Sequence, residues 1–155
     1  MTFERTHDMR LVERILKDPQ CYRRNVDDSC PSIEDFHVPD DLDFSAIVAR
    51  EDGETVALFL IFHPVPAIGD VHFYVLPRAW GCSRAIVRAF LAWVWEKTSL
   101  TDLIGRIPAF NRLAYRVAID CGFRDMRREP GAVVRRGVRY DMLITEIARP
   151  TCATS

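Results

Sequence analysis

The stretch Asp70–Lys97 constrains the fold of this chain more than any other part of the sequence. Its residue pattern predicts a buried strand over Val71–Leu76, a turn over Pro77–Ser83 and a long helix over Arg84–Lys97. The first N–H groups of a helix have no partner inside the helix, and they carry the positive end of its dipole. A strand that leads through a turn into a helix N-terminus therefore predicts an anion site, suited to a phosphate or a pyrophosphate.

Length and composition fit one globular domain. The chain has 155 residues, of which 48% are hydrophobic and 28% charged, with a formal net charge of −1. We place the domain at residues 1–149 and expect a flexible tail at 150–155. A net charge near zero gives no general attraction to nucleic acid or anionic lipid, so nucleic-acid binding is disfavoured. The charged N-terminus and the short apolar run Val56–Phe62 favour a cytoplasmic protein without membrane contact.

The cysteine pattern predicts free thiols. The five cysteines are widely spaced and form no CxxC pair, so neither a zinc site nor a disulfide framework is indicated: Cys21, Cys30, Cys82, Cys121 and Cys152. We expect no metal. Cys82 lies beside the predicted helix N-terminus, which lowers the pKa of a thiol, but an inert thiol is the favoured interpretation.

The rest of the pattern predicts a mixed α/β chain. Before the central stretch, we expect a short strand, two helices, a long acidic loop and two strands: Thr2–Thr6, His7–Lys17, Pro19–Arg24, Asn25–Asp43, Phe44–Arg50 and Thr55–Phe62. Pro64 and Pro66 are predicted to end the last of these strands, and Gly69-Asp70 to turn the chain. After the central stretch, we expect a strand, a helix and two strands around a turn at Glu129–Gly137: Asp102–Ile107, Asn111–Cys121, Phe123–Arg128 and Val138–Ile147.

Two local motifs and this order of elements resemble the GNAT (GCN5-related N-acetyltransferase) superfamily. V-L-P-R-A-W-G-C-S-R-A (Val75–Ala85) is similar to the family's acyl-CoA pyrophosphate turn, V-x-P-x-x-R-G-x-G-x-G/A. N-R-L-A-Y-R-V-A-I-D-C-G-F (Asn111–Phe123) is similar to its N-x-x-A-x-x-x-Y-x-x-x-G-F helix. The resemblance covers nearly the whole chain. It implies a mostly antiparallel central sheet of six to seven strands, flanked by about four helices.

This chain departs from the family pattern at several positions. Aligned on Pro77, the family arginine falls on Trp80, and of the turn's three glycines only Gly81 is kept. The other two glycines fall on Ser83 and Ala85, where Ser83 offers a backbone N–H and a hydroxyl and is also a good helix N-cap. Arg78 or Arg84 would have to supply the missing charge, although solvation at the surface is the simpler role for either one.

The second motif lacks the family tyrosine, the usual proton donor to the departing thiolate, because this position is Ala118. Tyr115 lies three residues earlier, on a neighbouring face of the helix, and packing is its favoured role over catalysis. Leu113 and Val117 are predicted to face inward. Asn111 begins this helix, where it would either cap the helix or bind a pantetheine chain.

The resemblance implies acetyl-CoA as co-substrate and an amine as acceptor. A backbone N–H near Tyr74–Leu76, in a gap between the fourth and fifth strands, would polarise the thioester carbonyl. His72 is the candidate base and Tyr115 the candidate acid, against structural roles for both. The candidate acetyl-CoA-binding residues are Tyr74, Val75, Leu76, Trp80, Gly81, Cys82, Ser83, Arg84, Ala85 and Asn111.

The losses in both motifs leave a second interpretation open. A catalytically degenerate GNAT-fold protein would act as a structural or interaction component with protein partners. The Trp-Gly turn resembles GNAT-like proteins encoded by tailed phages, which implies a host cytoplasm or a virion as the location. If the chain is an enzyme, the acidic loop would favour a cationic acceptor, with Asp40 and Asp41 attracting it.

Overall fold

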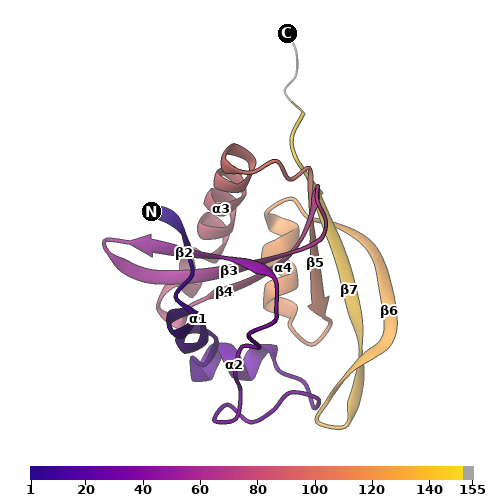
Figure 1. Ribbon diagram of the computed structural model, residues 1–155. Helices are drawn as coiled ribbons and strands as arrows, with labels where there is room; N and C mark the ends of the chain where they lie inside the picture. The colour runs from indigo at the N-terminus through magenta and orange to yellow at the C-terminus, as the bar shows by residue number, and fades with distance from the viewer. Residues whose placement is uncertain (152–155) are drawn as a thin grey trace.

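Within residues 1–151, which the computed structural model describes, the strands form one seven-stranded sheet in the order β1-β2-β3-β4-β5-β7-β6 (Figure 1). The strands are β1 (Thr2–Thr6), β2 (Phe44–Glu51), β3 (Glu54–Val65), β4 (Ile68–Val75), β5 (Asp102–Pro108), β6 (Arg124–Arg135) and β7 (Val138–Ala148). Neighbouring strands are antiparallel except for β4 and β5. The predicted fold class is therefore confirmed. Residues 152–155, with Cys152, lie outside the described part, so the predicted tail falls mostly there.

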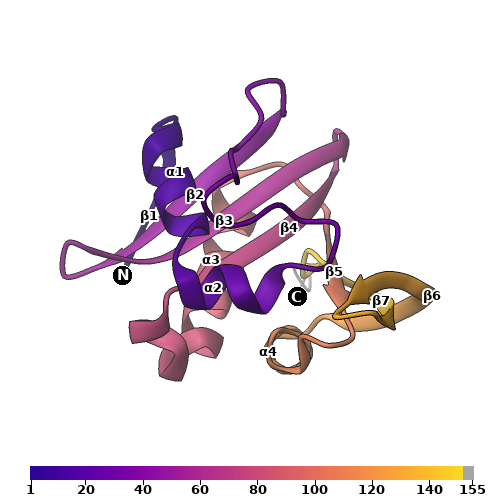
Figure 2. The ribbon, with the colours of Figure 1, turned by 90° about the horizontal axis from the view of Figure 1, so that it is seen from below.

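Helices cover both faces of the sheet. In residues 1–151 they are α1 (Met9–Leu16), α2 (Pro19–Asn25), the 3-10 helix η1 (Pro77–Cys82), α3 (Ser83–Lys97) and α4 (Arg112–Asp120). Figures 1 and 2 show α1 and α2 on one face and α3 and α4 on the other. None of these helices is both long and apolar enough to span a bilayer.

The alternation of apolar residues along β3 builds the two cores. Leu58 and Leu60 pack with Val12 of α1 on one face, and Phe59 packs with Phe90 of α3 on the other. The Phe59 and Phe90 rings are stacked with their centroids 3.7 Å apart. Because side chains alternate across a strand, a continuous apolar run fits only a strand covered on both faces. The predicted central position of this strand is confirmed.

β4 and β5 separate along their length, which opens the sheet. They pair only from Ile68 to Asp70, opposite Asp102 to Ile104. Beyond these residues β4 stays paired with β3, while β5 stays paired with β7 as far as Pro108. The predicted gap between the fourth and fifth strands is therefore present in the backbone.

Two predicted turns were wrong. β3 continues to Val65, and the turn is at Pro66-Ala67, so Gly69 and Asp70 belong to β4. The β3–β4 ladder is irregular between Phe62 and Val65, so it requires no regular ladder hydrogen bond from Pro64.

The turn between the last two strands is also shorter than predicted. Only Arg136-Gly137 turns the chain, and both residues have positive φ, 52° and 75°. This is the geometry of a tight two-residue hairpin. The strands extend through the predicted Glu129–Gly137 turn because the ladder accommodates an irregularity between Glu129 and Val133.

Arg149 joins the end of the last strand to the end of α3. Its guanidinium donates to the carbonyl oxygens of Trp95, Thr98 and Leu100, at 2.6, 2.7 and 2.9 Å. Carbonyls at a helix C-terminus lack partners inside the helix. We expect Arg149→Ala to lower the free energy of unfolding by about 2 kcal/mol, because buried acceptors lose a charged donor.

Urea denaturation measures this loss. Arg112→Ala, at an exposed position on α4, is the matched control and should change stability little. A loss no larger than that of the control would contradict the role given to Arg149.

Candidate functional site

The gap between β4 and β5 exposes backbone groups of β4. The Leu76 amide donates to the Val56 carbonyl oxygen at 2.9 Å, toward β3. Because successive residues of a strand direct their backbone groups to opposite sides, Val75 and Phe73 direct theirs toward the gap. Within the predicted range Tyr74–Leu76, the Leu76 amide is therefore not free. Phe73 was missed, although alternation along the strand could have identified it.

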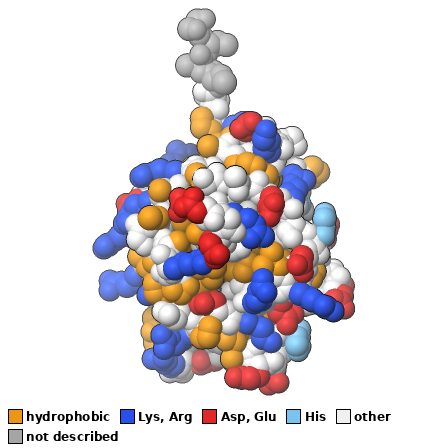
Figure 3. Space-filling model, turned by 90° about the vertical axis from the view of Figure 1, so that its left-hand side faces the viewer, with side chains coloured by type: hydrophobic (Ala, Val, Ile, Leu, Met, Phe, Trp, Pro, Cys, Tyr) orange, Lys and Arg blue, Asp and Glu red, His pale blue; other side chains and the backbone are white. Residues whose placement is uncertain are grey.

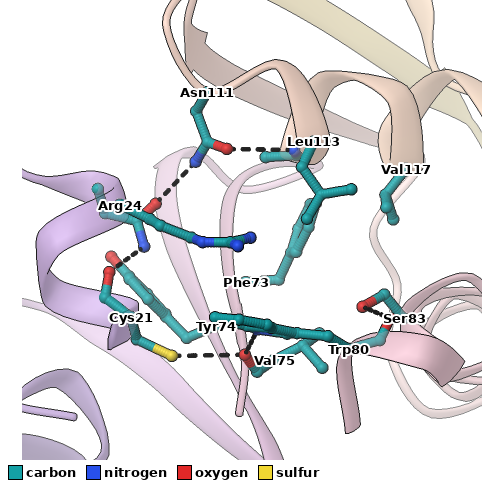
Figure 4. A pocket seen from close by; sticks show the side chains of 12 residues that line it. Cys21, Arg24, Phe73, Tyr74, Val75, Trp80, Ser83, Asn111, Leu113 and Val117 are labelled. Atoms are coloured by element: carbon teal, nitrogen blue, oxygen red, sulfur yellow. Dashed lines mark hydrogen bonds between the residues drawn. The ribbon is translucent and has the colours of Figure 1, made fainter. Parts of the chain in front are cut away.

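A cleft made of two adjoining pockets lies between this gap and the start of α3, and Figure 4 shows the pocket beside α3. At the gap its walls come from β4, β5, the start of α4 and the end of α2: Asn25, Val71, His72, Phe73, Tyr74, Gly105, Arg106, Ile107, Pro108, Asn111 and Ala114. Toward α3 the walls also include residues of α2, the turn after β4 and α4: Cys21, Arg24, Val75, Trp80, Ser83, Leu113 and Val117. Asn25, Phe73, Tyr74, Asn111 and Ala114 line both parts, so the two parts of the cleft adjoin.

Trp80 turns inward at the position where the family has arginine. Its indole Nε1 donates to the Val75 carbonyl oxygen at 2.8 Å. The Cys21 thiol donates to the same oxygen at 3.4 Å, and burial raises the pKa of this thiol to about 12. The guanidinium carbon of Arg24 lies 3.8 Å from the centre of the indole ring. The Trp80 side chain thus forms the floor of the cleft, and it does not cover the residues that follow it, Gly81 and Cys82.

The turn and the first residues of α3 are open to solvent. Gly81, Cys82, Arg84 and Ala85 are exposed, and a Cβ at Gly81 would meet no atom within 4 Å. Cys82 is the N-cap of α3 and accepts no hydrogen bond with its side chain. The expectation that Ser83 would be the N-cap was wrong, since it is the first helical residue.

The two arginines beside the turn are already paired. Arg78 Nη1 donates to Glu54 Oε2 at 2.8 Å, and Arg84 Nε donates to Asp120 Oδ2 at 2.6 Å. The buried Ser83 hydroxyl also has a partner, the Trp80 carbonyl oxygen at 2.8 Å. The sequence pointed to these groups for the missing charge and hydroxyl, and all three have partners within the protein, although Arg84 uses only its Nε for this pair.

His72 lies at the gap end of the cleft. It is half-buried, and its ring meets the Phe62 ring edge-on at 5.4 Å between centroids. Burial lowers the pKa of His72 below its ordinary 6.5, Arg106 lowers it further, and Asp70 opposes the shift. Asp70 accepts from Arg106 Nε at 3.3 Å, while its buried Oδ1 has no partner in residues 1–151.

Asn111 caps α4 and also bridges the cleft. Its Oδ1 accepts from the Ala114 amide at 3.2 Å, which confirms the predicted cap. Its Nδ2 donates to Asn25 Oδ1 at 3.1 Å, so α4 is joined to α2 across the cleft. Figure 4 shows this bridge above the Arg24 side chain.

Tyr115 is not among the residues that line the cleft. Its hydroxyl donates to Asp125 of β6, and this hydrogen bond raises the pKa of the phenol. Leu113 was predicted to face inward but is 44% exposed, because it forms part of the open cleft wall. Val117 is buried as predicted.

Carboxylates are absent from the cleft lining given above. Asp40 and Asp41 are exposed on the loop before β2 and do not line it. Asp28, on the same loop, instead accepts from the amides of Arg136 and Gly137 at 2.7 and 2.9 Å, which lowers its pKa. In Figure 2 this loop leaves α2 toward the β6–β7 hairpin and then passes in front of β4.

On the side of the molecule that carries the β2–β3 turn, both signs of charge are interspersed around an apolar band (Figure 3). In residues 1–151 no group of three or more His, Cys, Asp or Glu side chains is placed to hold a metal ion.

Solved structures resemble this geometry over nearly the whole chain. A crystal structure named for phosphinothricin N-acetyltransferase has a TM-score of 0.74 and 19% identity, covering 97% of this chain and 99% of that one. A spermidine N-acetyltransferase from Vibrio cholerae, in complex with CoA and spermine, has a TM-score of 0.72 and 13% identity, covering 96% and 95%. The fold is that of the GNAT N-acetyltransferases.

The GNAT fold is thus shared at low sequence identity. A third structure, from Streptococcus mutans, has a TM-score of 0.71 and 19% identity, covering 97% of this chain and all of the other. No family model and no curated protein sequence matches the chain. Together these findings establish the fold and not the activity of this protein.

Proposed function

We propose that this protein is an N-acyltransferase that moves an acetyl group from acetyl-CoA to an amine. The single observation that carries the proposal is the cleft of two adjoining pockets that leads from the open β4–β5 gap to the start of α3. An elongated acyl donor with a diphosphate at one end suits such a cleft. The GNAT fold supports the same conclusion.

The turn would hold the diphosphate and β4 would hold the pantetheine arm. Arg84 and Ala85 are exposed in the first turn of α3, at the positive end of its dipole, whereas the Ser83 N–H already donates to the Trp80 carbonyl oxygen. The backbone of Phe73 and Val75 faces the gap, where an N–H can bind the thioester carbonyl oxygen. The apolar wall of Leu113 and Val117 suits the arm between these two ends.

His72 would accept the proton of the attacking amine. Its lowered pKa keeps the imidazole neutral at pH 7, as a base requires. The amine nitrogen forms a bond to the thioester carbon, the carbon–sulfur bond breaks, and the sulfur leaves as a thiolate. The proton from nitrogen passes to His72.

The alternative is a catalytically degenerate GNAT-fold protein that serves as a structural component, including one of a phage particle. Trp80 in place of arginine and the position of Tyr115 outside the cleft favour it. Isothermal titration of the protein with acetyl-CoA separates the two. Binding followed by turnover with a panel of amines would support the enzyme, whereas no binding at millimolar acetyl-CoA would leave the structural role.

A carboxylate placed at Ala85 tests the diphosphate position. Ala85 is exposed in the first turn of α3, where an acidic side chain stabilises a helix. We expect Ala85→Glu to keep or slightly raise stability and to weaken acetyl-CoA binding about thirtyfold, roughly 2 kcal/mol of repulsion between the two anions.

Ala92→Glu is the matched control for this test. It adds the same charge at an exposed position two turns further along α3, about 10 Å away. Its acetyl-CoA affinity should stay close to that of the unmodified protein. Equal affinities for the two variants in calorimetry would remove the diphosphate from this turn.

A further inference from the structure

Arg24 places an unpaired guanidinium inside the cleft. Within residues 1–151 its side chain makes no hydrogen bond or ion pair, although the guanidinium carries five N–H donors. Figure 4 shows the side chain reaching from α2 across the cleft, above Trp80 and toward Leu113. A half-buried cation without an acceptor indicates a place prepared for an anion.

The surroundings of Arg24 indicate where an anion would bind and which other charges are near it. The guanidinium lies over the indole ring of Trp80, and Ser83, the first residue of α3, lines the same part of the cleft. The lining of this cleft includes no aspartate or glutamate that would compete for the charge. The other two arginines near the turn, Arg78 and Arg84, are held by Glu54 and Asp120.

We propose that Arg24 binds the diphosphate of CoA, and that α2 thereby supplies the cation missing from position 80 of the turn. This inference rests on the proposed function and identifies a binding residue for it. Trp80 holds the guanidinium plane by a cation–π contact, and the edge of the plane remains available for a bidentate phosphate contact. Stacking before binding reduces the ordering cost when the ligand arrives.

The alternative role for Arg24 is structural, as a contact that only holds α2 against η1. Calorimetric titration with CoA separates the two roles, because a purely structural contact does not contribute to CoA affinity. The titration contains no acceptor, so an acidic group of an acceptor cannot account for the result. We expect Arg24→Gln to weaken binding of CoA and of dephospho-CoA by the same factor, about tenfold or more. An equal factor excludes the 3′-phosphate, which dephospho-CoA lacks, and leaves the diphosphate as the only other anionic group of CoA.

Arg23→Gln is the matched control. Arg23 is the exposed neighbour on α2, so both variants remove one positive charge from the same helix. The control should bind CoA as the unmodified protein does. Arg24→Lys keeps the charge but loses the planar fork, and an intermediate loss is expected.

A compensating change makes the test sharper. In the Arg24→Gln background, Trp80→Arg should recover at least part of the lost affinity, because it returns a guanidinium to the turn itself. Circular dichroism melting checks that each variant is folded, and Arg24→Lys carries the test if Arg24→Gln does not fold.

Three results would overturn the inference. Arg24→Gln would bind CoA as tightly as the Arg23→Gln control, or it would lose affinity for CoA alone and keep that for dephospho-CoA. If the unmodified protein bound no CoA at all, the inference and the proposed function would both fail. Retained CoA binding in Arg24→Gln would overturn the inference alone.

Discussion

Replacing His72 by glutamine is expected to lower kcat at pH 7 at least about a hundredfold, the usual contribution of a general base. Glutamine retains polar groups of similar reach but cannot accept a proton from the amine. His72 is half-buried at the gap end of the cleft, so the substitution removes the base without opening the core. Steady-state rates with acetyl-CoA and an accepted amine measure the effect, while CoA affinity should change little.

The pH dependence gives an independent check on His72. Because burial lowers its pKa below 6.5, kcat should fall as the pH drops through that lowered value, when the imidazole becomes protonated. Stability should fall over the same range. The unfolded chain takes up the proton near 6.5, and the folded chain takes it up only at lower pH.

His7→Gln is the control, since His7 is exposed and does not line the cleft. It should keep the rate and the acid limb of the profile. A His72→Gln variant with an unchanged rate and the same acid limb would contradict the role of His72, and the base would then have to be another group.

The largest loss of stability is expected for Phe90→Ala. Phe90 is 1% exposed and its ring stacks on Phe59 at 3.7 Å, between α3 and β3. Removing the ring leaves a cavity that the closely packed neighbouring residues cannot fill. The free energy of unfolding should therefore fall by about 3–5 kcal/mol. Urea denaturation with a common slope measures the change.

Phe36→Ala provides the comparison for this core substitution. Phe36 is half-buried and packs edge-on against Tyr22 at 5.5 Å, on the loop after α2. Its loss should be clearly smaller, because part of the ring already contacts water. Similar losses for the two variants would mean that α3 does not contribute the main core contact with β3.

Periodicity predicted the scaffold of the site because it follows from local burial. The apolar run of β3 can only be a strand covered on both faces, and the stripe of α3 requires a sheet beneath it. Gly122 at φ +103° ends α4 as predicted. These features depend on residues that are close together in the chain, so the local sequence pattern is enough to predict them.

The composition of the cleft was much harder to predict. Asn25 and Asn111 meet across 86 positions of sequence, and Arg24 reaches Trp80 from another helix. Arg78 and Arg84 could not be distinguished from free cations, since their partners Glu54 and Asp120 are distant in sequence. No periodic signal marks any of these contacts.

The order of apolar and polar residues by itself determined where the strands and helices lie, because the buried side of an element follows from the spacing of its apolar residues. It did not show that Pro77–Cys82 forms the 3-10 helix η1 rather than a turn. Only the tertiary structure decided that β4 and β5 part after Asp70, and that Arg24 rather than Arg78 or Arg84 remains unpaired beside the turn. The physical reason is that the availability of a charge depends on every group packed around it, and these groups come from separate parts of the chain.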